Sequence, residues 1–148
     1  MTGPIDVIVR QRTKPIGVHM KSKDTIWENA PSKEDYQAAE KYLRLLFSDG
    51  QAKRLTAALR RAPCIEYEAK DLLRASQTHL ASKDNRDVAR DMKKIKKGKK
   101  LSPVLLVRGY GPNGVTLTIA DGYHRICASW HWDEKLPVAC CLALFPNK

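Results

Sequence analysis

The fold of this chain is decided by the stretch Leu117-Thr118-Ile119-Ala120-Asp121-Gly122-Tyr123-His124-Arg125-Ile126-Cys127-Ala128-Ser129. Its first residues are apolar or β-branched and predict a strand, whereas the residues after the glycine are compatible with a helix. A strand that passes into a helix at such a turn directs free backbone N–H groups and the positive end of the helix dipole toward one point. The stretch therefore predicts a binding site for an anion such as phosphate.

Three residues of the turn offer groups that suit a phosphate. Gly122 either allows close backbone approach to the anion or only makes a tight turn that needs a positive φ. His124 is a candidate hydrogen-bond donor and acid or base near neutral pH, the alternative being a residue that only caps the helix start. Arg125 offers a planar fork for phosphate, the alternative being a salt bridge to Asp121 or Glu134.

Asp121 and Tyr123 complete the candidate site. Asp121 holds a magnesium ion or orients its neighbours in one interpretation, and in the more ordinary one it caps the following helix. Tyr123 stacks on a base or gates the pocket, or it is simply a packed aromatic side chain. His124 and Asp121 are thus the candidate catalytic residues, and the ligands of any metal remain unknown.

Length and composition indicate an intracellular globular protein. The 148 residues, 43% hydrophobic and 29% charged, fit one compact domain, with or without an appended helical arm. No apolar run approaches the roughly 18–20 residues that span a bilayer, so we expect no membrane contact. The four cysteines form no CxxC pair, which favours reduced thiols in a cytoplasmic protein.

The net charge of +11 is concentrated in one part of the chain. A cluster of this kind attracts polyanions and favours nucleic acid or another acidic partner, although it says nothing about sequence recognition. The alternative is a solvated helix face that keeps the protein soluble. The candidate nucleic-acid surface consists of Arg86, Arg90, Lys93, Lys94, Lys97 and Lys100.

The N-terminal half predicts an arm followed by a helical hairpin. Residues 1–31 show no sustained periodicity and are expected to form a tail or loosely packed arm. Residues 32–62 predict two amphipathic helices, the first opened by Ser32 and Asp35 in a capping-box arrangement and the second stopped before Pro63. Their apolar stripes favour a packing surface over a ligand box. The hairpin is also a candidate homodimer or protein-partner surface.

Residues 63–148 predict a small mixed α/β domain. Short or continuous apolar runs favour strands, and Asn85 is a candidate cap for a helix that Gly98 ends. The expected order is a strand at 65–67, a helix or turn at 69–75, a helix from 86, strands at 104–107 and 115–120 around a turn at 110–114, a helix to about 131, and a strand at 136–144.

Three elements of this domain resemble the ParB/sulfiredoxin-like superfamily. They are the strand led by Pro103, the turn Gly122-Tyr123-His124-Arg125 with the small Ala128 after it, and the closing strand after Pro137. The resemblance covers residues 64–145 and implies the small mixed sheet of that superfamily in a bacterial- or phage-type protein. It also implies that the turn cradles nucleotide phosphates, as in ParB-type proteins.

The chain departs from the superfamily pattern at two positions. Sulfiredoxins have a cysteine where this chain has Tyr123, so sulfiredoxin activity is not expected. The glutamate that ParB-type proteins use with magnesium has no counterpart inside the motif, where Asp121 precedes the glycine. The resemblance further implies that the loop with Ser76 and Gln77 approaches the same pocket.

These observations lead to three hypotheses. The first is a ParB-like protein that binds nucleotide or nucleic-acid phosphate at Asp121–Arg125, with the basic helix as its electrostatic surface. The second is a metal-dependent nucleotide hydrolase or nuclease that uses magnesium with a nucleoside triphosphate. The third is a protein–protein interaction module, in which the hairpin is the contact surface and the pocket is vestigial.

Overall fold

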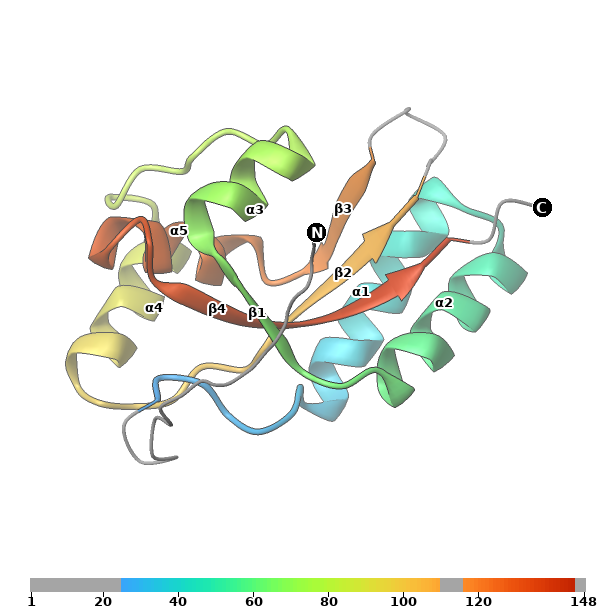
Figure 1. Cartoon of the computed structure of the whole chain (residues 1–148), viewed down its shortest axis with the longest axis horizontal. Helices are drawn as coiled ribbons and strands as arrows, with labels where there is room; N and C mark the ends of the chain where they lie inside the picture. Colours follow the sequence, from blue (N-terminus) through green and yellow to red (C-terminus); the bar gives the residue numbers. More distant parts are fainter. Residues whose placement is uncertain (1–24, 110–115, 146–148) are drawn as a thin grey trace, which may run out of the picture.

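The computed structural model describes residues 25–109 and 116–145, which fold as an α/β protein around a four-stranded mixed sheet (Figure 1). The strand order is β1-β4-β2-β3, with β2 parallel to β4 and the other pairs antiparallel. The predicted order of elements after residue 63 is confirmed. The elements are α1 (Lys33–Leu46), α2 (Asp49–Arg61), β1 (Ile65–Glu68), α3 (Ala69–Ser76), α4 (Arg86–Lys96), β2 (Val104–Arg108), β3 (Leu117–Asp121), α5 (Tyr123–Trp132) and β4 (Pro137–Leu144).

The helical hairpin forms as predicted because each helix satisfies its own first turn. The Asp35 N–H donates to Ser32 Oγ at 3.1 Å, and the Ser32 N–H donates to the Asp35 carboxylate at 2.8 Å. Ser48 and Gln51 make the same reciprocal pair at the start of α2. The turn between α1 and α2 is very short, because Phe47 ends α1 and Ser48 already caps α2.

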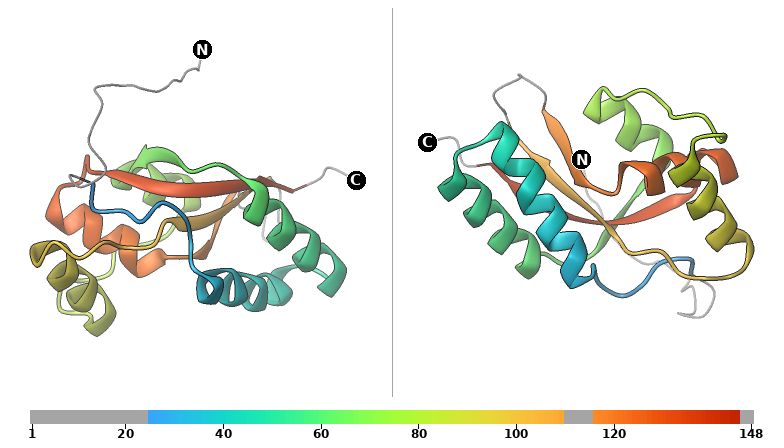
Figure 2. Two further views of the ribbon diagram at one scale, coloured as in Figure 1. Left: turned by 90° about the horizontal axis from the view of Figure 1, so that it is seen from below. Right: turned by 180° about the vertical axis from the view of Figure 1, so that it is seen from behind.

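The apolar stripes of the hairpin pack on one side of the twisted sheet, opposite α3 (Figure 2). Alternate residues of a strand point to opposite faces, so Leu105 and Cys141 meet the hairpin while Leu106 and Cys140 meet the core under α3 and α5. The packing interpretation of the stripes is therefore confirmed. On α1, Tyr42 and Leu45 remain exposed.

Part of the expected N-terminal arm belongs to the fold. Trp27 is 3% exposed, and its indole N–H donates to the Pro137 carbonyl at 2.9 Å. The backbone beside it makes two 2.7 Å hydrogen bonds with Leu101. Burial of a large aromatic ring thus anchors residues 25–28. Residues 1–24, and the turn expected at 110–114, lie outside the described residues.

The helix that carries the basic cluster has the predicted caps and buried face. Asn85 accepts hydrogen bonds from the N–H groups of the first turn of α4, and Gly98 takes the left-handed conformation just after its end. Val88 and Ile95 are buried in the core. No helix in the described ranges is long and apolar enough to cross a membrane.

Candidate functional site

The strand–turn–helix element forms where it was predicted, and its glycine is required by packing. β3 ends at Asp121, α5 begins at Tyr123, and Gly122 between them has φ +108°. A Cβ atom at this position would lie 2.7 Å from Val104 Cβ and 2.9 Å from an Arg125 guanidinium nitrogen. Both the backbone conformation and the close approach of β2 therefore demand glycine.

Asp121 does not cap α5, contrary to its more ordinary interpretation. No side chain caps the start of α5, because the Asp121 carboxylate instead accepts a hydrogen bond from Arg125 at 2.9 Å. This is one of the two salt bridges foreseen for Arg125. The N-terminus of α5 consequently keeps its positive dipole end without a carboxylate on it.

Arg125 ties the turn to the hairpin rather than pointing freely into solvent. Its side chain is 17% exposed, and its guanidinium lies 3.6 Å from the Asp35 carboxylate and 3.5 Å from the Pro103 carbonyl. Its buried Nε has no hydrogen-bond partner among the described residues. Arg125 therefore acts first as a structural bridge from α5 to the start of α1 and the residues before β2.

The two carboxylates on Arg125 differ in their proton affinity. Burial raises the pKa of Asp121, an effect that the Arg125 charge offsets only in part and that nearby Asp35 reinforces. Burial also works to raise the pKa of Asp35, but the Ser32 N–H and Arg125 outweigh it, so this pKa lies below its ordinary value. Of the pair, Asp35 is the better-stabilised carboxylate.

The inner cavity, as we call the space between the turn, α4 and the start of α1, has balanced charge. It has a volume of about 370 Å³. His124 faces it, with its side chain 40% exposed and its Nδ1 4.0 Å from Asp87. Four carboxylates and four cationic side chains line it, namely Asp35, Asp87, Asp91, Asp121, Arg90, Lys94, Lys100 and Arg125.

The outer groove, on the other side of α4, has a very different lining. It measures about 820 Å³ and lies between α4 and the end of α5, two helices that pack against each other (Figure 2). Trp132 at the end of α5 is 50% exposed there. Among the described residues that line the groove there is no carboxylate, and the lining consists of Arg86, Arg90, Lys93, Lys96, Lys97, Ala89, Met92 and Trp132.

The basic cluster, predicted from the sequence to form one surface, is thus divided between two cavities. Arg86, Lys93 and Lys97 line only the outer groove, whereas Lys94 and Lys100 line only the inner cavity. Arg90 borders both and pairs with the Asp87 carboxylate at 3.1 Å. The division follows from the helical period, because residues 93 and 94 project about 100° apart around the axis.

Ser76 and Gln77 are not brought to the inner cavity. The buried Ser76 hydroxyl is bonded within its own turn, to the Leu73 carbonyl and the Thr78 hydroxyl. Gln77, with φ 56°, ends α3 in a left-handed conformation. The chain then passes behind the turn, where the Tyr123 hydroxyl donates to the His79 carbonyl.

Tyr123 is held by this contact and has the packed character of its more ordinary interpretation. Burial raises its pKa to about 12, so its hydroxyl stays protonated near neutral pH. Its ring lies edge-on to the His124 ring, with a centroid separation of 5.2 Å. Tyr123 is thus partly buried, whereas Trp132 is 50% exposed.

Several residues of the site were not identified from the sequence. Asp35 was recognised only as a helix cap, because its contact with Arg125 depends on how the hairpin docks. Asp87 and Asp91 lie one turn apart on α4, a spacing that signals a shared helix face but no particular partner. Trp132 gave no signal either, since exposure of a helix-end aromatic depends on tertiary packing.

The described residues offer little support for a metal site. Within the described parts of the chain, no group of three or more His, Cys, Asp or Glu side chains is placed to hold a metal ion. The Asp121 carboxylate is engaged by Arg125. Of the two candidate catalytic residues, Asp121 is therefore better explained as the structural partner of Arg125 than as a metal ligand.

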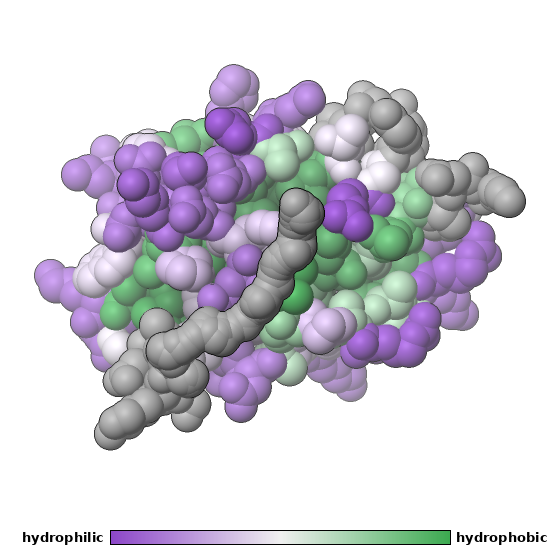
Figure 3. Space-filling view, in the orientation of Figure 1, coloured by the Kyte–Doolittle hydropathy of each residue, from purple (hydrophilic) through white to green (hydrophobic). Residues whose placement is uncertain are grey.

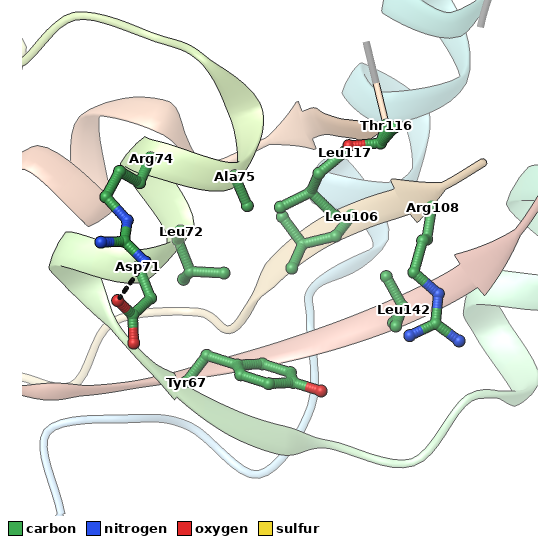
Figure 4. Close-up of a pocket in the computed structure, with 10 residues that line it drawn as sticks. All are labelled: Tyr67, Asp71, Leu72, Arg74, Ala75, Leu106, Arg108, Thr116, Leu117 and Leu142. Carbon is green, nitrogen blue, oxygen red and sulfur yellow. Dashed lines mark ion pairs between the residues drawn. The ribbon is translucent and has the colours of Figure 1, made fainter. Parts of the chain in front are cut away.

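A third cavity, of about 510 Å³, lies on the sheet, and none of the predicted site residues lines it. Figure 4 shows Leu72, Leu106 and Leu142 directed into it, with Arg74 and Arg108 at opposite sides. Figure 3 shows apolar side chains gathered near the middle of the same side of the molecule. Its lining is apolar at the centre and polar at the margin, which does not suit a phosphate group.

Comparisons with known proteins leave the site to be judged by its own geometry. A scan against protein-family models, a search of curated proteins and a search of solved structures each found no match. The fold, the two sides of α4 and the uncapped start of α5 are therefore the observations that bear on function.

Proposed function

We propose that this protein binds nucleic acid along the outer groove of α4, with the start of α5 as a separate position for a phosphate group. The observation that carries the proposal is the lining of the outer groove, which combines five cationic side chains with a half-exposed tryptophan. Cationic side chains on one surface release counterions from a nucleic-acid backbone, and an exposed aromatic face suits a base.

The position of the lysines has a structural explanation that is not sufficient on its own. Lysines in the last turn of α4 stabilise the negative end of the helix dipole. That effect is confined to the last turn, whereas the outer groove also includes Arg86 at the opposite end of the helix. A surface that extends along the whole helix fits a polyanion better than it fits a helix cap.

A second candidate function is binding of nucleotide phosphate in the inner cavity. The favouring observation is the uncapped N-terminus of α5, with Lys94, Lys100 and His124 among the lining residues. The carboxylates of the cavity oppose a free anion, so a nucleoside triphosphate carrying magnesium suits it better than a bare phosphate does. Arg125, held by Asp121 and Asp35, would position the turn rather than grip the phosphate.

Hydrolysis by a nucleotide hydrolase or nuclease has weaker support than binding. Such chemistry would require His124 as acid or base and Asp121 as a metal ligand. Its support is that His124 lines the cavity with a side chain that is 40% exposed. Asp121 would first have to give up its 2.9 Å bond to Arg125.

The binding proposal is tested by fluorescence anisotropy with labelled single- and double-stranded DNA over a series of salt concentrations. The variant Lys93→Glu/Lys97→Glu should lose affinity at least tenfold at low salt, and the slope of log K against log salt should fall by about two. The matched control, Lys41→Glu/Lys53→Glu, makes the same change in net charge on exposed positions of the hairpin. Equal losses in both variants would reduce the proposal to a general effect of net charge.

The nucleotide candidate needs its own experiment. Calorimetric titration with nucleoside triphosphates, with and without magnesium, should show binding that weakens in a His124→Ala/Lys94→Gln variant and is unchanged in Lys93→Glu/Lys97→Glu. Binding that responds only to the outer pair would remove the inner cavity from consideration.

A further inference from the structure

Cys64 and Cys141 come together across the β1–β4 ladder. In this antiparallel pair Ile65 is opposite Cys140, so the next register position places Cys64 opposite Cys141. Residues at such positions have neighbouring Cβ atoms on the same face of the sheet. The two sulfur atoms lie 3.7 Å apart, although 77 positions separate the residues in the sequence.

The two thiols differ in access. Cys64 is exposed at the connection between α2 and β1, where its thiol, when protonated, donates to the Asn29 carbonyl at 3.3 Å. Cys141 is 1% exposed, under the hairpin. An external reagent therefore reaches Cys64 first, and Cys141 is in place to react with whatever forms on Cys64.

The contact between the thiols also activates the exposed one. A hydrogen bond from the Cys141 thiol stabilises the Cys64 thiolate and, against the effect of burial, lowers the pKa of Cys64 to about 7. The same contact raises the pKa of Cys141. Near neutral pH a substantial fraction of Cys64 is thus a nucleophilic thiolate, beside a Cys141 thiol that stays protonated.

We propose that Cys64 is a modification site for hydroperoxides and that its oxidation closes an intramolecular disulfide with Cys141. The Cys64 thiolate sulfur bonds to one peroxide oxygen as the O–O bond breaks, and the departing oxygen takes a proton, leaving a sulfenic acid. The Cys141 sulfur then bonds to the Cys64 sulfur, the S–O bond breaks, and hydroxide leaves as water with the Cys141 proton. Two electrons pass from the thiols to the peroxide.

The other two cysteines provide internal controls. The Cys140 side chain lies on the opposite face of β4 from Cys141, where its thiol contacts the Ile65 carbonyl at 3.6 Å. Burial raises the pKa of Cys140. Burial raises the pKa of Cys127 as well, on α5. Both are fully buried, so a hydroperoxide should leave them as thiols.

The experiment treats the purified full-length chain with hydrogen peroxide, alkylates the remaining thiols after denaturation, and measures intact mass and linked peptides. Two of the four cysteines should escape alkylation, and proteolysis should release a Cys64–Cys141 linked peptide. Cys140→Ser should behave like the parent. Cys64→Ser should keep its remaining thiols, and Cys141→Ser should accumulate a sulfenic acid on Cys64 that dimedone traps.

Two results would overturn the proposal. One is full alkylation of all four cysteines at peroxide concentrations that oxidise Cys64 in Cys141→Ser. The other is a disulfide between two chains through Cys64. Circular dichroism checks the fold of each variant, and Cys64→Ala and Cys141→Ala replace the serine variants if the hydroxyl prevents folding.

Discussion

The two sides of α4 carry similar numbers of cationic side chains, but only the inner side also has carboxylates in its lining. On the inner side every positive charge has a carboxylate in the same cavity, and Arg125 is bound by two of them. On the outer side five cationic side chains share a groove whose described lining contains no carboxylate, and of the five only Arg90, which borders both sides, pairs with Asp87 from the inner cavity. A count of lysines and arginines therefore does not locate a polyanion surface, because the neighbouring acids decide how much of the charge is available.

The largest effect is expected from removing Arg125, which lies on the inner side. Arg125→Ala leaves the partly buried Asp121 and Asp35 carboxylates without their shared cation and should lower the free energy of unfolding by about 3 kcal/mol. Urea denaturation measures this loss.

Arg90→Ala is the matched arginine. Its pair with Asp87 is more exposed, so the cost should stay at about 1 kcal/mol or less. Similar losses in both variants would show that Arg125 does not stabilise the fold as a bridge between α5 and the hairpin.

An effect of intermediate size is expected from Trp132. Trp132→Ala should weaken binding of single-stranded DNA by about 1–2 kcal/mol, because a stacked base loses its aromatic platform. The change should be smaller for duplex DNA, whose bases are already stacked, and the salt slope should not change.

Trp132→Phe is the control, since it keeps an aromatic face and should recover most of the affinity. If Trp132→Ala binds both forms as the parent does, the outer groove binds through its charges alone.

The smallest effect concerns Asp35 and depends on pH. Its pKa is lowered in the folded protein, so its contribution to stability is present above the ordinary pKa of an aspartate and is lost as pH falls through the folded value. Asp35→Asn should cost about 1 kcal/mol at pH 7, including the weakened cap.

The raised pKa of Asp121 acts in the opposite direction, since it favours the folded state as pH falls. Asp121 is the same in the parent and in Asp35→Asn, so its effect cancels in their comparison. Because the parent loses the contribution of the Asp35 charge in acid, the difference in free energy of unfolding between the two proteins should be smaller at pH 3 than at pH 7 in urea denaturation. A deficit that is equal at both pH values would contradict the role of charge at this position.

The secondary structure was predictable because its signals are local. Asn85 and Gly98 delimit α4 by capping chemistry, and the continuous apolar run of β2 is buried on both faces as expected. Trp27 was missed because one buried ring in an irregular segment leaves no periodic pattern.

The candidate site was predictable only as far as the turn itself. Gly122 and the Arg125–Asp121 pair lie within five residues of each other, so spacing was enough to suggest them. The contact with Asp35 joins residues 90 positions apart in the sequence and requires the hairpin to dock on the sheet. The prediction for Ser76 and Gln77 was wrong because both residues belong to the end of α3. The Ser76 hydroxyl bonds to the Leu73 carbonyl there, and Gln77 ends the helix in a left-handed conformation.

The most direct test compares the two sides of α4 with equal changes of charge. DNA affinity would be measured by anisotropy across a salt series for Lys93→Glu/Lys97→Glu on the outer side and for Lys94→Glu/Lys100→Glu on the inner side, after circular dichroism confirms that both fold. We predict at least a tenfold loss and a shallower salt slope for the outer pair, with a loss of no more than about threefold for the inner pair. Equal losses, or a larger loss for the inner pair, would contradict the assignment of the outer groove as the nucleic-acid surface.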